Sequence, residues 1–152
     1  MIKKINKQVL KEKIYRLIRK LFSLDKFHFE KIKILNSVIL DIIDFSKISG
    51  NKEFVAFLDG KIIDKSLIID KLIYTEFRSS YDSAVPITHF STNQHFGSVH
   101  SHPSFSNKPS KADLAFFRKY GIVHAIICRP YNEKSITFYD YNGQVLDVEI
   151  IN

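Results

Sequence analysis

Four side chains that could bind a metal or move a proton lie close together in the stretch HSHPSFSNKPSKAD, residues 100–113. Side chains alternate along a strand, so His100 and His102 would share one face, about 7 Å apart along the chain. Asp113, in the first turn of a following helix, could swing back to supply an oxygen ligand. Two neutral histidines and one carboxylate leave a fourth coordination position open to water, the composition of a catalytic zinc site.

The same residues also allow a plainer interpretation, a polar surface turn followed by a helix cap. An H-x-H pair is weak evidence by itself, and the S-x-x-D spacing of Ser110 and Asp113 is typical of a capping box. Pro103 and the strand-to-helix context favour the metal site. Structural zinc sites are usually closed by cysteines, and the single cysteine, Cys128, lies elsewhere in an apolar segment and is expected to be an inert core thiol.

A water activated at such a site needs a general base, and a carboxylate is the usual choice. Glu53 opens the apolar segment EFVAFLDG, where an unpaired charge is costly and calls for a partner. Glu76 and Glu133 are the other mid-chain candidates, and both are expected in loops or turns. Spacing alone leaves this choice open.

Two helices are predicted around the site from capping and periodicity. The first spans 36–48, with Asn36 or Ser37 as its cap and Gly50 just past its end. The second spans 110–120, with Ser110 as N-cap and Gly121 after the last turn.

Extended segments make up most of the remaining chain, and they predict an α/β (α+β) domain whose mixed or mostly antiparallel sheet is flanked by helices. Residues 78–83 are expected to form a loop. The expected strands are 29–35, 53–60 with a turn at Asp59-Gly60, one or two over 61–77, 84–90, 95–103, 122–130, and a hairpin over 135–150 that turns at Asn142-Gly143.

Length and composition are those of one soluble domain: 152 residues, 45% hydrophobic and 26% charged. One cysteine excludes an intrachain disulfide and favours a reducing compartment. No signal peptide is evident, and no apolar run approaches the roughly 18 residues of a spanning helix. We therefore expect a cytoplasmic protein without a transmembrane segment.

The net charge of +7 is concentrated near the N-terminus. Residues 1–34 hold 11 Lys and Arg against 3 Asp and Glu, whereas the rest of the chain holds 12 against 13. Residues 9–22 have the periodicity of a basic amphipathic helix. We expect this helix to dock on the domain, with a dimer contact, a membrane surface or an acidic partner as alternatives. Few aromatic residues accompany the charge, so nucleic-acid binding is not expected.

Taken together, these residues resemble the JAMM (MPN+) metalloprotease family. Its pattern is an upstream glutamate, then H-[ST]-H-P, then S-x-x-D, with ten residues between the second histidine and the aspartate. The stretch from His100 to Asp113 matches every element, and EFVAFLDG matches the upstream element at Glu53. The similarity is closest to small single-domain archaeal members. It predicts a JAMM domain of the cytidine-deaminase-like fold over 31–152, with residues 1–30 as an added basic helix.

The resemblance implies a zinc-dependent isopeptidase that cuts between the C-terminal glycine of a ubiquitin-like modifier and a target lysine. By motif position, one zinc ion per chain would be held by His100, His102 and Asp113. Glu53 would deprotonate the water and pass the proton to the leaving amine. Ser110 would donate a hydrogen bond to the oxyanion, while Ser101 and Pro103 would shape the strand end.

Two alternatives stay within the resemblance. One is a peptidase that processes sulfur-carrier proteins or their cysteine adducts, and the other is an assembly scaffold without activity, which the complete residue set disfavours. Four further histidines match no motif position and are expected to be structural or solvated: His28, His89, His95 and His124. The chain lacks the insertion that relatives cutting polyubiquitin carry after the motif, so that linkage specificity is not expected. The segment 75–83 would lie beside the substrate groove, and 84–90 would pair with the substrate tail.

Overall fold

The computed structural model describes residues 29–74, 77–80, 83–86 and 95–152, with side chains described outside 75–94. The predicted helix at 9–22 lies outside these ranges, and so do Glu76, His28 and His89. In the part of the chain that the structure describes, no helix is long and apolar enough to cross a membrane.

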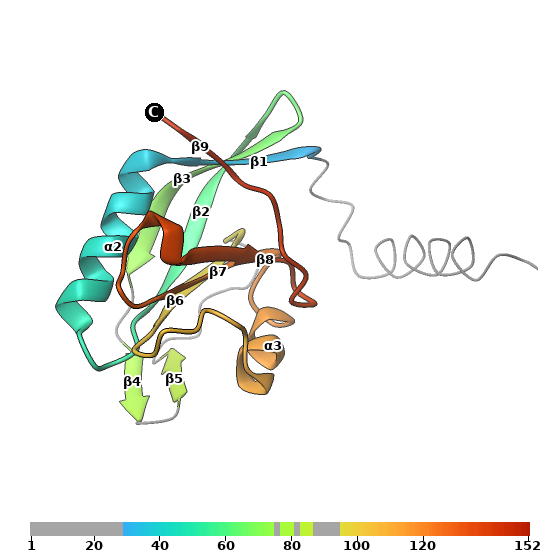
Figure 1. The fold of residues 1–152 in the computed structure, drawn as a ribbon. Helices are drawn as coiled ribbons and strands as arrows, with labels where there is room; N and C mark the ends of the chain where they lie inside the picture. The colour runs from blue at the N-terminus through green and yellow to red at the C-terminus, as the bar shows by residue number, and fades with distance from the viewer. Residues whose placement is uncertain (1–28, 75–76, 81–82, 87–94) are drawn as a thin grey trace, which may run out of the picture.

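Seven strands form one mixed sheet, in the order β8-β7-β6-β2-β3-β1-β9 (Figure 1). Strand β1 runs parallel to β3 and β9, and β6 runs parallel to β7, while the other neighbours are antiparallel. The strands are β1 (Lys31–Leu35), β2 (Val55–Ile63), β3 (Ser66–Tyr74), β6 (Gly97–His102), β7 (Val123–Cys128), β8 (Ile136–Tyr139) and β9 (Glu149–Ile151). The predicted α+β class with a mixed sheet is confirmed.

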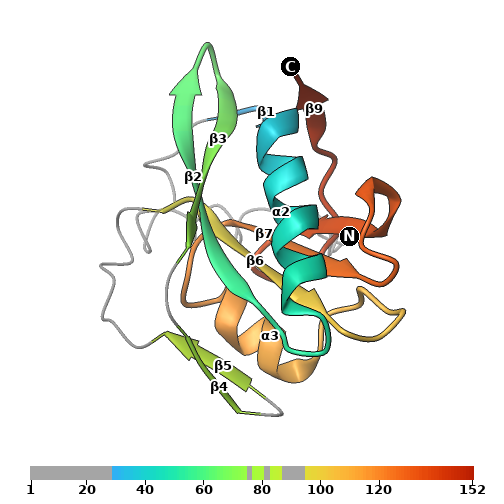
Figure 2. The same cartoon turned by 90° about the vertical axis from the view of Figure 1, so that its left-hand side faces the viewer.

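The two helices α2 (Asn36–Ser49) and α3 (Lys111–Phe117) lie on opposite faces of this sheet (Figures 1 and 2). The apolar stripe of α2 is buried in the main core, which also takes Ala56, Leu58, Val99 and Ala125 from the central strands. A smaller cluster on the other face joins Phe117 of α3 to Ile126 and Tyr139. The remaining elements are η2 (Glu133–Ser135) and a separate pair, β4 (Phe77–Ser80) and β5 (Ser83–Pro86).

The central strands are buried on both faces, and successive side chains along each strand point to opposite faces of the sheet. On β6, Val99 belongs to the main core under α2. Its neighbours Ser98 and His100 therefore point to the face that carries α3. By the same alternation His102 also lies on the α3 side of the sheet, whereas Ser101 lies on the side of Val99.

The turn predicted at Asp59-Gly60 is wrong. Strand β2 continues to Ile63, and the register with β3 shifts between Asp59 and Gly60, which marks a bulge. A Cβ at Gly60 would lie 2.0 Å from the Ile68 carbonyl oxygen, so the glycine serves close backbone approach and does not form a turn. The chain reverses at Asp64 and Lys65, whose φ angles of 46° and 60° suit a tight hairpin.

The hairpin predicted over 135–150 is only partly correct. The turn forms, with Gly143 N–H donating to Asp140 O, but a single bridge, Tyr139↔Val145, pairs its two sides. Strand β9 instead pairs with β1 at the opposite edge of the sheet. A local turn signal cannot show this, because the partner strand is more than a hundred residues away.

Several helix and loop boundaries in the structure differ from those predicted from the sequence. Leu35 takes the N-cap position of α2 without a side-chain cap, whereas Asn36 and Ser37 already lie inside the helix. Helix α3 ends at Phe117, three residues early. Of the loop predicted at 78–83, residues 78–80 and 83 belong to the β4–β5 pair and 81–82 lie outside the described chain. Of the strand predicted at 84–90, only 84–86 falls in the described chain.

Gly97 offers a test of how closely β6 approaches β7. A Cβ at this position would lie 1.5 Å from the Val123 carbonyl oxygen. We expect Gly97→Ala to lower the free energy of unfolding by about 3 kcal/mol, because the strands must separate to admit the methyl group. Urea unfolding would measure the loss, and a value below about 1 kcal/mol would contradict this packing.

Candidate metal centre

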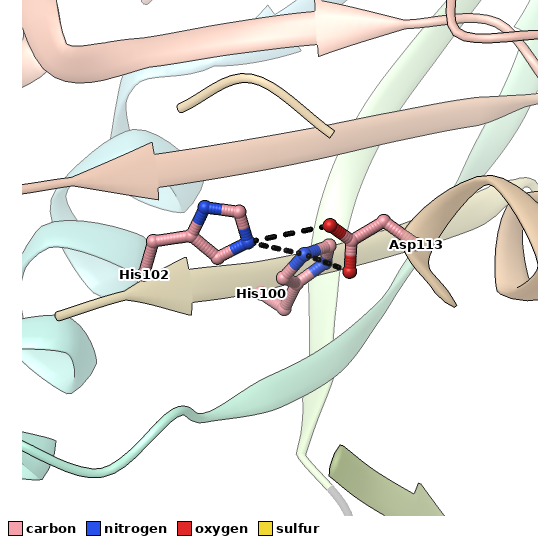
Figure 3. Close-up of side chains that lie close together, drawn as sticks. All are labelled: His100, His102 and Asp113. Carbon is pink, nitrogen blue, oxygen red and sulfur yellow. Dashed lines mark hydrogen bonds and ion pairs between the residues drawn. The ribbon is translucent and has the colours of Figure 1, made fainter. Parts of the chain in front are cut away.

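His100, His102 and Asp113 converge on one point between the end of β6 and the start of α3. Figure 3 shows the two imidazoles and the carboxylate pointing toward one another. Each offers one ligand atom, and these atoms lie within 4.8 Å of one another. Within the described part of the chain, the structure therefore brings together the three residues that the sequence assigned to a metal.

The ligand atoms lie close together, and the two histidines face different carboxylate oxygens of Asp113. His100 Nε2 lies 3.2 Å from His102 Nε2 and 3.1 Å from Asp113 Oδ1, and His102 Nε2 lies 3.5 Å from Asp113 Oδ2. With metal–ligand bonds of about 2.0–2.1 Å, neighbouring ligands of a tetrahedron are separated by about 3.3–3.4 Å. Two nitrogens and one oxygen leave one corner of that tetrahedron unfilled by these residues, so the donor set fits an open zinc site.

A capping box at the start of α3 holds Asp113 in this position. The Ser110 N–H donates to Asp113 Oδ2 at 2.6 Å, and the Asp113 N–H donates to Ser110 Oγ at 3.2 Å. The carboxylate is therefore drawn back over the helix end, with Oδ1 toward His100. The capping box predicted from the sequence is confirmed, and the same aspartate keeps Oδ1 directed toward His100, where it could also bind a metal.

The imidazole of His102 is oriented by a backbone carbonyl. Its Nδ1 lies 2.9 Å from the Ser106 carbonyl oxygen. Because a carbonyl only accepts, Nδ1 carries a proton, and Nε2 faces Asp113 and His100. In the protonated ring Nε2–H can donate to Asp113, whereas the neutral ring would present the Nε2 lone pair to a metal. This arrangement of a ligand histidine and a carbonyl acceptor is typical of metal sites.

The charges of the cluster stabilise one another. Burial acts to raise the pKa of Asp113, but hydrogen bonds with His100 and His102 outweigh it, so this pKa lies well below its usual range. For His102, burial acts to lower the pKa, while hydrogen bonds to Asp113 and the Ser106 carbonyl raise it above the usual value. The aspartate is thus ionised throughout the neutral range, as a metal ligand must be.

Sheet register places Glu53 beside this cluster. Val55 pairs with His100 in the antiparallel β2–β6 ladder. Continuing that register by two residues brings Glu53 opposite His102 and on the same face of the sheet. The half-buried Glu53 lies just before β2 and not inside it as predicted, and its charge contributes to the raised pKa of His102.

Three side chains tie the backbone around Glu53 to the rest of the site. Ser101 Oγ accepts from the Phe54 N–H at 3.0 Å, and the Ser101 N–H donates to the Phe54 carbonyl at 3.0 Å. The Tyr131 hydroxyl lies 3.0 Å from the Gly50 carbonyl and 3.4 Å from the His102 carbonyl. Arg129 donates to the Asn51 side chain. Ser101 thus positions the backbone, in agreement with the role that the sequence suggested.

Beneath the cluster, aromatic rings fill the space between β6, β7 and α3. The Phe117 ring stacks on His124 at 4.2 Å between ring centres and lies 6.0 Å from His100. His124 is fully buried, and its Nδ1 lies 2.8 Å from Ser98 Oγ. Cys128 is a buried free thiol whose pKa is raised by burial. Both side chains are buried in the packed interior.

The sequence did not point to three residues that support the ligands, one through a local backbone contact and two through long-range contacts. Ser106 acts through its carbonyl, which has no sequence signature. Tyr131 lies 29 residues from His102, and Asn107, discussed below, bonds residues 28 to 32 positions away. The only available signal was that Ser106 and Asn107 lie within the motif stretch itself.

Comparison with known families decides where the chain belongs. The Prok-JAB family, the prokaryotic homologues of the JAB domain, matches residues 35–141. The chain belongs to this family. The matched region contains Glu53 and the whole stretch from His100 to Asp113, so the resemblance noted in the sequence is confirmed.

A named relative and two solved structures agree with this family assignment, and a third structure shares the fold. A probable metalloprotease of Haloferax volcanii is 31% identical over 94 residues, which cover 62% of this chain and 56% of the relative. The chain thus spans about half the length of that relative. A structure described as JAMM, a metalloprotease-like zinc site in the proteasome and signalosome, is 31% identical with a TM-score of 0.64, covering 81% of this chain and 100% of its own.

A JAB1/MPN domain protein from Archaeoglobus fulgidus is 30% identical with a TM-score of 0.64, over 81% of this chain and 99% of its own. A protein from Desulfitobacterium hafniense has the same fold, with 12% identity, a TM-score of 0.56, and coverage of 80% and 93%. At the level of the domain, the expectation of a JAMM/MPN fold is therefore confirmed.

His124 predicts how the stability of the zinc-free protein depends on pH. Burial lowers the pKa of His124 to about 3, whereas an unfolded histidine has a pKa of about 6.5. Between these values the unfolded state binds a proton that the folded state does not. The free energy of unfolding therefore falls as the pH falls from about 6.5 to about 3, by up to about 1.4 kcal/mol per pH unit for this one group.

We expect His124→Asn to remove this contribution from the slope, as measured by urea unfolding of zinc-free protein across that pH range. His102 and Asp113 titrate in both proteins, so their effects cancel in the comparison. Equal slopes for the variant and the wild type would show that His124 is not held neutral.

Proposed function

We propose that this protein is a zinc-dependent isopeptidase that hydrolyses the bond between the C-terminal glycine of a ubiquitin-like modifier and a target lysine. The observation that carries the hydrolytic chemistry is the convergence of His100, His102 and Asp113, whose ligand atoms lie within 4.8 Å of one another, with Glu53 on the same side of the sheet by register. Family membership supports the choice of a peptide-type bond. The modifier as substrate follows from the motif resemblance.

His100, His102 and Asp113 would hold the ion through Nε2, Nε2 and a carboxylate oxygen. The donor set suits zinc because it combines two imidazoles, one of them oriented by a carbonyl, with a carboxylate kept ionised by its neighbours. When bound, zinc supplies Lewis acidity and makes water acidic enough to ionise near pH 7.

Glu53 would act as the general base and then as the general acid. Its carboxylate accepts the proton of the attacking water as the new C–O bond forms at the glycine carbonyl. The same proton then passes to the lysine nitrogen as the C–N bond breaks. The products are a free modifier carboxylate and a free lysine amine.

Ser110 would stabilise the oxyanion of the tetrahedral intermediate. Its Oγ accepts the Asp113 N–H, which leaves the hydroxyl proton free to donate outward, and the side chain lies at the exposed edge of the site. A donor fixed by a helix cap needs little reorganisation as the charge develops. One serine can therefore serve as both N-cap and oxyanion donor.

Glu53→Gln tests the assignment of the base. The amide cannot accept the proton, so we expect turnover of a Gly-Gly-tailed modifier–lysine conjugate to fall by about 10²–10⁴, while zinc stays near one ion per chain. Zinc content by atomic spectroscopy and conjugate cleavage would be measured on the same samples. Glu133→Gln, at the exposed alternative carboxylate, is the matched control and should retain full turnover.

Three other outcomes would separate the parts of this proposal. Turnover retained in Glu53→Gln would refute its role as base. Zinc in both proteins with cleavage in neither would contradict the modifier–lysine substrate and direct attention to sulfur-carrier conjugates. Wild-type protein that takes up no zinc would refute the assignment of the three ligands.

Ser110→Ala should lower kcat by about 10²–10³ if the hydroxyl donates to the oxyanion, and should also cost about 1 kcal/mol of stability through the lost cap. Ser110→Gly separates the two effects, because glycine at an N-cap costs only a few tenths of a kcal/mol. Steady-state kinetics and urea unfolding of both variants would measure this. Turnover near wild type in Ser110→Gly would assign the serine to capping alone.

A further inference from the structure

The loop between β6 and α3 carries an anchor that the motif does not explain. Asn107 Nδ2 donates to Thr137 Oγ1 at 2.7 Å and to the Ser135 carbonyl at 3.3 Å. The Tyr139 hydroxyl donates to the Asn107 carbonyl at 2.8 Å. Side chain and backbone of one loop residue are thus both bonded to β8 and the turn before it.

This anchor crosses the sheet. The loop follows β6, whereas its partners belong to β8, and β7 lies between these two strands. Thr137 is paired with Ile126 of β7, and Tyr139 is buried against Phe117 of α3. The loop is therefore fixed to a part of the fold that is itself held by core packing.

The peptide unit before Asn107 connects this anchor to the metal ligands. The Ser106 carbonyl and the Asn107 Cα lie in one planar peptide group, so holding Asn107 restricts where that carbonyl points. The same carbonyl accepts the Nδ1 proton of His102 at 2.9 Å. Asn107 can therefore act on His102 without touching it.

We propose that Asn107 is a positioning residue that fixes the Ser106 carbonyl and thereby holds His102 with Nε2 toward the metal. The route runs from β8 through the Asn107 amide to the Ser106 carbonyl and the His102 ring. This inference rests on the proposed ligand role of His102, but it does not depend on the identity of the substrate. Partners that orient a ligand histidine typically change metal affinity by 10–100-fold when removed.

The test compares Asn107→Ala with two variants of its partner on β8. Thr137→Val removes the acceptor at nearly constant volume, whereas Thr137→Ser keeps the hydroxyl. Zinc affinity would be measured by competition with a chelator, and the His102 tautomer by ¹⁵N NMR of the zinc-free protein. Lys108→Ala, an exposed side chain in the same loop, is the matched control.

We expect Asn107→Ala to weaken zinc binding by 10-fold or more and to reduce the population of the His102 tautomer protonated at Nδ1. Thr137→Val should also weaken zinc binding and lower the population of this tautomer. Thr137→Ser and Lys108→Ala should keep zinc affinity and tautomer population near the wild-type values. The double variant Asn107→Ala, Thr137→Val should bind zinc no more weakly than Asn107→Ala alone, because the two substitutions break the same connection.

Asn107→Ala that lowers the melting temperature but leaves zinc affinity and the His102 tautomer unchanged would overturn the proposal, since a merely structural role predicts that result. Additive effects of Asn107→Ala and Thr137→Val on zinc affinity would overturn it as well. Failure of the isopeptidase proposal looks different: zinc binding would respond as expected while the modifier conjugate stays intact. If the wild type bound no zinc, the tautomer measurement alone would decide the role of Asn107.

Discussion

The hydrogen-bonded register between β2 and β6 is the constraint on which the site depends. It pairs Val55 with His100, extends through the bonds between Ser101 and Phe54, and so brings Glu53 opposite His102. Side chains alternate with a period of two, so a slip of one residue would turn both histidines into the core under α2. Burial of Val99 on that face makes such a slip costly, because a polar imidazole would replace an apolar side chain there.

Electrostatic interactions stabilise the cluster of His100, His102 and Asp113 that the register and helix α3 bring together. Three polar groups that would be costly to bury singly are placed so that each satisfies another, with Asp113 accepting from both histidines and from the helix N-terminus. The three side chains therefore lie close together, with their facing ring nitrogens and carboxylate oxygens 3.1–3.5 Å apart.

Around the three ligands, the fold supplies support from several directions. The capping box holds Asp113, the Ser106 carbonyl orients His102, and Ser101 and Tyr131 hold the segment that carries Glu53. These contacts come from different elements, so the geometry is set by the packed domain and not by the motif loop alone. That division explains how β6 and α3 can present the ligand atoms together although a loop with little regular structure connects them.

The sequence by itself determined the residue types of the site, the strand and helix that carry them, and the mixed α+β class. These follow from local rules: two-residue alternation puts His100 and His102 on one face, and S-x-x-D makes a capping box of Ser110 and Asp113. Only the tertiary structure decided that Glu53 lies opposite His102, that β9 joins β1, that Gly60 lies beside a bulge and that Asn107 bonds to β8. Each of these depends on contacts between segments far apart in the chain, and no local pattern of residues specifies which distant backbone a strand or side chain will meet.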